Sequence, residues 1–174
     1  FGQPVPPRNS IQLGVDYLKL DSPDALGAHP TIRYARHFAN DRIVVAATGG
    51  FFTRLQSNSL TGHTRIRLTA DLSVLADLLR SQRHALRLGG GPSAWYRYDD
   101  LFTSARFLQN PTTGETNTVS QRSQVTAIDL GWHLTSEYAY AVMSDFTVTG
   151  RIMVANLGAG GVSPMAGLGL SFHF

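Results

Sequence analysis

The chain has 174 residues, 15 Lys and Arg against 12 Asp and Glu, and no cysteine. This length fits one domain, and the lack of cysteine excludes a disulfide framework and a thiolate metal site. The basic residues are almost all arginines spread singly along strand-like segments, which argues against a nucleic-acid surface. No apolar run reaches the roughly 18 residues of a membrane helix, yet the charged fraction is low at 16% and glycine is abundant at 17 residues.

The first half of the chain predicts four strands. Residues 9–20 alternate apolar and polar side chains, and residues 21–30 predict a loop because they are rich in Pro, Gly and Asp. A second strand ends at Asn40-Asp41, a pair suited to a two-residue hairpin turn that places Phe38 opposite Ile43. A third strand follows over 43–52, then a loop over 56–63. Strict alternation over 65–78 predicts the fourth strand.

The second half predicts four more strands. After a turn at 81–83, the fifth strand should end near residue 99, with a bulge or twist at 89–92 because Pro92 lacks a ladder donor. Residues 101–122 are expected to be the longest irregular stretch, with a tip at 110–117. A sixth strand over 125–133, a tight turn at 135–137, a seventh strand over 138–152 and a closing strand over 162–174 follow. The connections would then alternate long and short.

The two faces of these strands have an inverted polarity. One face is apolar, whereas the other carries small, polar and charged side chains of both signs. We expect the charges to point inward and to pair, because an isolated ionised group inside a narrow barrel is strongly unfavourable. The expected interior charge network consists of Asp16, Arg33, Arg65, Arg67, Asp71, Asp77, Arg87, Arg97, Asp129, Asp145 and Arg151.

The closing strand gives the clearest indication of the class of protein. Its apolar face holds Ala166, Leu168, Leu170, Phe172 and Phe174. With the stretch 86–97 (LRLGGGPSAWYR), this pattern resembles the small OmpA/OmpX-like, porin-family outer-membrane β-barrels of Gram-negative bacteria. The resemblance implies an all-β, eight-stranded antiparallel up-and-down transmembrane β-barrel over residues 9–174. Residues 1–8 would be a periplasmic lead from which a signal peptide has been removed.

The register also predicts where outward aromatic side chains gather. An aromatic girdle at the periplasmic rim would contain Phe38, Trp132, Tyr138, Tyr140, Phe172 and Phe174, with Tyr17, Phe51, Tyr96 and Tyr98 towards the opposite rim. The resemblance further implies that Phe174 is part of the signal read by the assembly machinery through the C-terminal strand.

These features predict a non-enzymatic protein of the bacterial outer membrane. It would be a scaffold or interaction module with a lumen plugged by Asp and Arg side chains, in contact with outer-membrane lipids and lipopolysaccharide. An envelope protein could bind at residues 100–122. A narrow ion or solute pore is the alternative interpretation of the same charges. A soluble lipocalin-like barrel is a third possibility, and extraction without detergent would reveal it.

No catalytic residue, metal site or cofactor is expected. A lipid A-modifying barrel enzyme is disfavoured because His133 is not followed by the His-x-Ser arrangement of the deacylases. His29 and His63 are interpreted as solvated loop histidines. Only His133 and His173 could meet across strands near the periplasmic rim, and a hydrogen-bonded interior pair is favoured there over a metal site.

Overall fold

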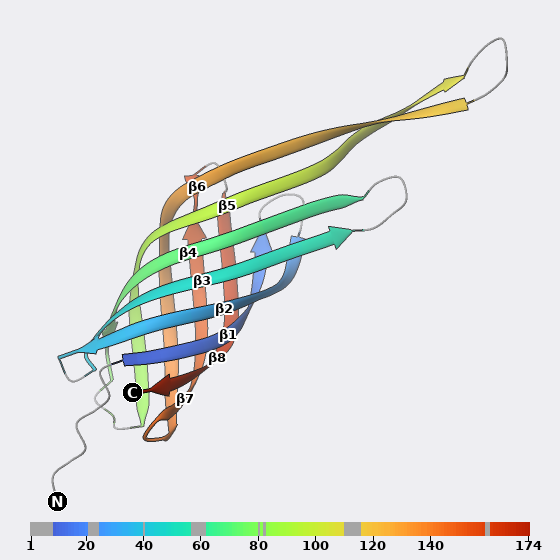
Figure 1. The fold of residues 1–174 in the computed structure, drawn as a ribbon. Helices are drawn as coiled ribbons and strands as arrows, with labels where there is room; N and C mark the ends of the chain where they lie inside the picture. The colour runs from blue at the N-terminus through green and yellow to red at the C-terminus, as the bar shows by residue number, and fades with distance from the viewer. Residues whose placement is uncertain are drawn as a thin grey trace, which may run out of the picture.

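The computed structural model describes residues 9–20, 25–39, 41–56, 62–79, 81, 83–109, 116–158 and 161–174. Within them lie eight antiparallel strands: β1 (Asn9–Leu20), β2 (Ala25–Phe38), β3 (Ile43–Gln56), β4 (His63–Asp77), β5 (His84–Gln109), β6 (Thr116–Met143), β7 (Phe146–Asn156) and β8 (Val162–His173). Each strand pairs with the next and β8 pairs with β1, so the sheet closes (Figure 1). The predicted eight-stranded up-and-down barrel is confirmed. None of the described residues forms a helix of the length and apolarity needed to cross a membrane.

The seam between the first and last strands closes the barrel. Ile11 lies opposite Phe172 and Leu13 opposite Leu170. Asn9 and Phe174 exchange two backbone hydrogen bonds of 3.2 and 3.0 Å. Closure leaves neither β1 nor β8 as an open edge. We call the end where β1 begins and β8 ends the terminus-side end, and the other the arm end.

The first hairpin turn has the predicted register. Phe38 lies opposite Ile43, and the backbone N–H of Arg42 donates to the carbonyl of Ala39 at 3.4 Å. Asp41 has a positive φ angle of 65°, as the second central residue of a two-residue hairpin turn requires, and Ala39, the first residue of the turn, also has a positive φ of 51°. Asn40 lies outside the described residues.

The first predicted loop is too long. It was expected over 21–30, but β2 already begins at Ala25. Pro30 is tolerated because β2 pairs with β3 only from Thr31 onwards, so Pro30 has a strand neighbour on one side alone, opposite Val15.

The expected irregular stretch 101–122 is wrong for most of its length. β5 continues to Gln109 and β6 begins at Thr116, and the two remain paired from Leu101 opposite Ser123 to Gln109 opposite Thr116. Residues 110–115, most of the predicted tip, lie outside the described part of the chain. Residues 116–123 are mostly polar and residues 101–109 mix apolar and polar side chains without regular alternation, a composition that resembles a loop. We call 101–109 and 116–123 the arm.

The predicted turn at 135–137 is also wrong, and so is a seventh strand that starts at residue 138. β6 runs without interruption to Met143, the turn is Ser144-Asp145, and β7 covers 146–156. A polar triplet suggested a turn, but the apolar alternation keeps the same phase from Ile128 to Tyr140, which is what one continuous strand produces.

A bulge was expected at 89–92, and the register shows none there. Asp71 lies opposite Ser93 and Val74 opposite Gly90, in one register. The shifts occur between Phe102 and Ser104 and between Ala141 and Met143. A Cβ on Gly89 would overlap the carbonyl oxygen of Val74, so glycine permits the close approach of β5 to β4 at this position.

The predicted alternation of long and short connections is not observed. The intervals between strands are 39–42, 78–83 and 144–145 at the terminus-side end, and 21–24, 57–62, 110–115 and 157–161 at the arm end. The asymmetry lies in the strands instead, because β5 has 26 residues and β6 has 28, against 11 in β7. The arm therefore projects well beyond the barrel wall (Figure 1).

The barrel is polar inside and apolar outside. Apolar side chains cover its outer surface, where Leu130 is 70% exposed and Leu168 is 71% exposed, while Asp16, Arg33 and Glu137 are buried inside. A soluble barrel has the opposite arrangement, because its apolar face forms the core.

Candidate functional site

The middle of the lumen contains an ion cluster centred on Glu137. This side chain is 2% exposed and accepts hydrogen bonds from Arg33 of β2 and from Arg87 of β5, the latter at 3.0 Å. Arg33 also donates to Gln12 of β1 at 3.3 Å. The cluster thus joins four strands across the lumen. Sequence reasoning missed Glu137 because it was assigned to a turn, although it has the same parity as the inward-facing Asp129 and His133.

A second ion cluster crosses the lumen from β1 to β7. Asp16 accepts a hydrogen bond from Arg151, and its Oδ2 lies 3.6 Å from Nδ1 of His29. The other ring nitrogen of His29 is 3.0 Å from the Thr69 hydroxyl. His29 is therefore a buried strand residue, and its assignment as a solvated loop histidine is wrong.

His133 is held in the lumen between two serines. Its Nε2 lies 2.8 Å from Ser73 Oγ, and its Nδ1 lies 2.8 Å from Ser93 Oγ. Asp71 Oδ1 is 4.0 Å from the same Nδ1 and accepts a hydrogen bond of 3.1 Å from the Trp95 indole. All five side chains are buried. The ring is satisfied on both nitrogens, so the geometry fits a structural role within the core.

The histidine of the last strand meets a different partner than expected. The rings of His37 and His173 are 5.4 Å apart at the terminus-side end, whereas His133 lies deeper in the lumen. His37 bonds to Ser10 at 3.0 Å, and His173 to Thr147 at 2.9 Å. The predicted meeting of His133 and His173 is wrong because β6 extends ten residues beyond His133.

Asp41 in the first hairpin turn is bound to this histidine pair. Its Oδ1 lies 3.0 Å from Nδ1 of His37. The hydrogen bond from His37 is the main influence that lowers the pKa of Asp41 from its ordinary value. The turn is therefore linked electrostatically to the lumen side chains nearest the terminus-side end.

Apolar side chains close the lumen toward the arm end. A cluster buried to 4% exposure or less joins strands β1, β3, β5, β7 and β8 and the turn after β7; it comprises Leu18, Leu20, Phe52, Trp95, Met153, Ala155, Leu157 and Met165. A smaller cluster of Ala35, Val44, Ala46 and Leu75 fills the wall from β2 to β4. Sequence reasoning attributed the filling of the lumen to Asp and Arg alone. The apolar layer is an additional component.

Arginines and aspartates lie beyond this apolar layer, at the arm end of the lumen. Arg67 donates to both carboxylate oxygens of Asp99, at 2.8 and 2.9 Å. Arg97 Nε lies 3.0 Å from Asp129 Oδ2. Asp99 and Arg65 are also adjacent, with 3.9 Å between Arg65 Nε and Asp99 Oδ1.

Two members of the expected charge network do not lie in the lumen. Asp145 is exposed in the turn between β6 and β7. Asp77 ends β4, and its carboxylate accepts backbone hydrogen bonds from Leu79 and Leu86 at 3.0 and 3.1 Å, so it caps a turn. The other nine lie on inward faces: Asp16, Arg33, Arg65, Arg67, Asp71, Arg87, Arg97, Asp129 and Arg151.

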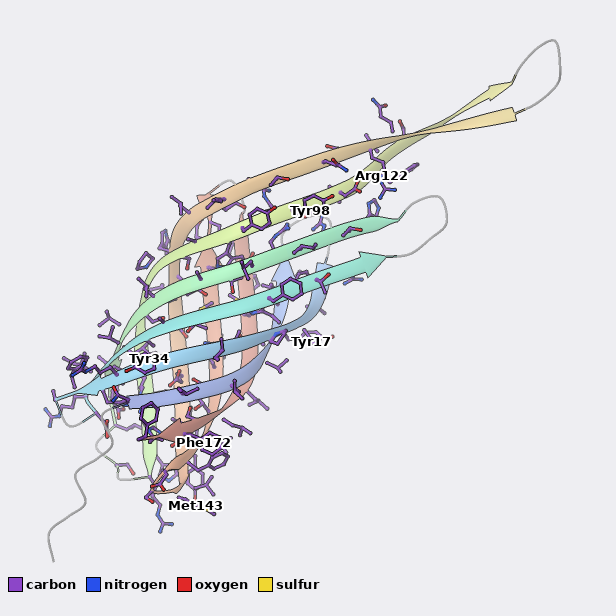
Figure 2. All side chains as sticks on the ribbon, in the orientation of Figure 1. Tyr17, Tyr34, Tyr98, Arg122, Met143 and Phe172 are labelled. Atoms are coloured by element: carbon purple, nitrogen blue, oxygen red, sulfur yellow. The ribbon has the colours of Figure 1, made fainter. Side chains whose placement is uncertain are left out.

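The predicted rim aromatics lie at both ends of the barrel. Phe172 packs on Phe146 with ring centroids 5.1 Å apart at the terminus-side end, and Tyr138 bonds to His84 at 2.6 Å there. Trp132 lies opposite Asn156, the last residue of β7, so its assignment to the terminus-side rim is wrong. The remaining girdle residues, Phe38, Tyr140 and Phe174, lie at the terminus-side end. Figure 2 shows Tyr34, Met143 and Phe172 near that end and Tyr98 and Arg122 toward the arm.

The base of the arm is fixed to the barrel on one side only. Arg122 donates to Asp100 and to the carbonyl of Gly62, both at 2.9 Å, and the backbone N–H of Phe102 donates to Nδ1 of His63 at 3.1 Å. His63 is therefore half-buried at the start of β4 and not a solvated loop residue. On the other side, no described strand pairs with β6 before Trp132, where pairing with β7 begins, although Leu130 and Gly131 lie against residues 156–158. We call residues 116–129 the free edge of β6.

Comparisons with known proteins place this architecture. No family model and no curated protein matches the chain. Among solved structures, it is similar to Neisserial surface protein A, with a TM-score of 0.68 and 16% identity over 95% of this chain and 97% of that one. It is also similar to Ail, the attachment invasion locus protein of Yersinia pestis, with a TM-score of 0.60 and 12% identity over 96% and 97%. A further Ail structure, with a TM-score of 0.58 and 12% identity over 96% and 97%, contains the heparin analogue sucrose octasulfate.

The chain therefore has the fold of the small eight-stranded outer-membrane β-barrels, as the resemblance to OmpA/OmpX-like proteins implied. No group of three or more His, Asp or Glu residues in the described segments could hold a metal ion.

Proposed function

We propose that this protein is a non-enzymatic barrel of the bacterial outer membrane that displays the arm as a binding element for an envelope or external protein. The apolar outer surface and the polar lumen support the membrane location. A strand needs about 9–11 residues to cross the hydrocarbon layer. β7, with 11 residues, meets this length, while β5 and β6 are more than twice as long, so their excess lies outside the bilayer.

The free edge of β6 is the observation that carries the binding function. Among the described strands, residues 116–129 of β6 pair only with β5, and residues 101–109 of β5 pair only with β6. Natural proteins usually protect such edges with Pro, Lys or short length. These segments contain neither Pro nor Lys and are long. An extended segment of a partner can therefore add to the free edge through backbone hydrogen bonds.

Site-specific photo-crosslinking in intact cells tests the free edge. A photoreactive residue at Ser123 should give a discrete protein adduct, whereas the same residue at Arg83, exposed at the terminus-side end, should not give that adduct. Replacing residues 101–123 by an Asn-Gly turn should abolish partner binding and leave the barrel folded, because Asp100 and Gln124 remain a paired position. An unchanged partner complex in the arm-deleted protein would refute the proposal.

We propose further that the lumen is a plug and not a pore. Glu137, Trp95 and Phe52 are each buried to 2% exposure or less, and they lie on different strands that face the same interior. In planar bilayers the protein should give no steady conductance. Steady openings of hundreds of picosiemens would establish the narrow pore instead.

Three parts of this function rest on the sequence pattern and the fold class. Outer-membrane lipids and lipopolysaccharide would contact the apolar wall. The C-terminal strand with Phe174 would direct assembly, and residues 1–8, which lie outside the described part of the chain, would be a periplasmic lead.

A further inference from the structure

Three arginines are exposed at the terminus-side end of the barrel. Arg36 lies on the outward face of β2, Arg42 ends the first hairpin turn, and Arg83 lies just before β5. Within the part of the chain that the structure describes, no carboxylate forms an ion pair with any of the three. Arginine stays protonated in proteins, so each side chain presents a full positive charge to the surroundings. We call these three residues the basic rim.

The carboxylates in the turns of this end have other partners or lie in a different turn. Asp41 is bound to His37 at 3.0 Å, and Asp77 accepts two backbone hydrogen bonds. Asp145 is exposed in the turn between β6 and β7, which contains none of the three arginines. The segments of this end outside the described residues, 1–8, 40, 80 and 82, contain no Asp or Glu and two more arginines. The remaining acidic residues outside the described part belong to connections at the arm end: Asp21, Asp24 and Glu115.

Arg36 differs from the other two arginines because it belongs to the apolar outer wall. Its neighbours across the sheet are Asn9 and Val45, and its guanidinium carbon lies 5.5 Å from the centre of the Phe38 ring. The hydroxyl of Tyr34, the preceding outward residue of β2, donates to Asn9 at 3.0 Å (Figure 2 labels Tyr34). A charged side chain on a lipid-facing wall is destabilising at the bilayer mid-plane and tolerated near the interface. Because β2 ends at Phe38, Arg36 lies at the level of the lipid headgroups.

We propose that the basic rim binds the phosphodiester groups of anionic phospholipids in the leaflet at the terminus-side end, an inference that rests on the proposed membrane location. Guanidinium groups bind phosphate through paired, charge-assisted hydrogen bonds. Phosphatidylglycerol matches the rim better than phosphatidylethanolamine, because the ammonium group of the latter is repelled by arginines that have no carboxylate partner. The wall beside Arg36 is apolar, with Ile11 and Val45 exposed, and it provides the contact surface for the acyl chains.

Native mass spectrometry of the full chain tests the basic rim, after release from nanodiscs that contain phosphatidylglycerol and phosphatidylethanolamine in equal amounts with the same acyl chains. The parent protein should retain several-fold more phosphatidylglycerol. Arg36→Gln should lower this preference by up to about fivefold, the contribution of one cation near an anionic surface. Combining it with Arg42→Gln and Arg83→Gln should abolish the preference. Arg54→Gln is the matched control, because Arg54 donates to the carbonyl of Leu26 at the arm end and its replacement removes an equal charge.

The outcomes that overturn the inference are distinct from those that refute the membrane location. An equal loss of preference in Arg54→Gln would show a general charge effect, and an equal loss in Arg36→Lys and Arg36→Gln would show that the charge is not what binds the lipid. In discs that also contain lipopolysaccharide, its retention through the same arginines in place of phosphatidylglycerol would overturn the choice of lipid. An inserted barrel that retains both phospholipids equally would overturn only this inference, whereas a chain that does not insert into nanodiscs would refute the membrane location itself.

Discussion

Removal of the Glu137 carboxylate should be one of the most destabilising single changes in the lumen. Glu137 is 2% exposed and accepts charge-assisted hydrogen bonds from Arg33 and Arg87. Each such bond contributes about 1.5–3 kcal/mol, and removing one partner of a buried ion pair costs about 3–5 kcal/mol because a charge is left uncompensated. Glu137→Ala leaves two buried guanidinium groups, those of Arg33 and Arg87, without their carboxylate. We therefore expect the free energy of unfolding to fall by about 4 kcal/mol or more.

Equilibrium urea unfolding in phospholipid vesicles, followed by the fluorescence of Trp95 and Trp132, measures this change. Asp145→Asn is the matched control, because it removes a carboxylate from the exposed turn that follows β6. It should change the free energy of unfolding by less than about 0.5 kcal/mol. If Glu137→Ala fails to insert, replacing Glu137 by Leu together with Arg33 and Arg87 by Met should restore insertion, since a packed apolar trio carries no unpaired charge. A Glu137→Ala protein as stable as Asp145→Asn would refute the reasoning.

Three other changes have defined outcomes. The hydrogen bond from His37 lowers the pKa of Asp41 in the folded protein. The ionised Asp41 carboxylate therefore stabilises the fold above the unfolded pKa of about 4, and this stabilisation is lost as pH falls through the lower folded pKa. Asp41→Asn should thus be slightly less stable than the parent at pH 7, by about 0.5 kcal/mol in this half-exposed turn, and equal to it in strong acid; a constant difference in urea titrations at both pH values would contradict this. Gly131→Ala should destabilise the barrel by about 1–3 kcal/mol, because its Cβ would overlap the Asn156 carbonyl, whereas Gly49→Ala meets only Thr69 O at 3.9 Å and should be tolerated in the same assay. Deletion of Phe174 should lower outer-membrane levels in cells more than it lowers the stability of the purified barrel; normal levels would argue against its role as an assembly signal.

Alternation predicted the barrel wall well where one face meets lipid and the other meets the lumen. The phase of β1 from Ile11 to Tyr17, and the turn that pairs Phe38 with Ile43, follow directly from local residue order. Inward charges such as Asp16 and Arg151 could be assigned to the lumen for the same reason. Their partners could not, because the pair lies 135 residues apart in sequence and is brought together only by closure.

The errors concern places where polarity has two possible causes. Residues 116–122 are mostly polar and residues 101–109 show no regular alternation, so both segments have the sequence signature of a loop. Thr135 and Glu137 are polar because the lumen is polar, yet the cluster of polar residues was interpreted as a turn. The signal that identifies one strand is the unbroken phase of Ile128, Leu130, Trp132 and Tyr138. Arg54 was missed because the third strand was predicted to end at residue 52, whereas β3 continues to Gln56.

The continuity of β6 also has a mechanical consequence. One strand of 28 residues includes the exposed free edge, the histidine layer at His133 and the ion cluster at Glu137, and it keeps pairing with β5 from Gln109 opposite Thr116 down to His84 opposite Tyr140. A pulling force on a partner attached to the arm would act along this backbone. The load would reach the buried ion pairs of Glu137 through covalent bonds, so an ion cluster inside the lumen anchors the element that projects beyond the barrel wall.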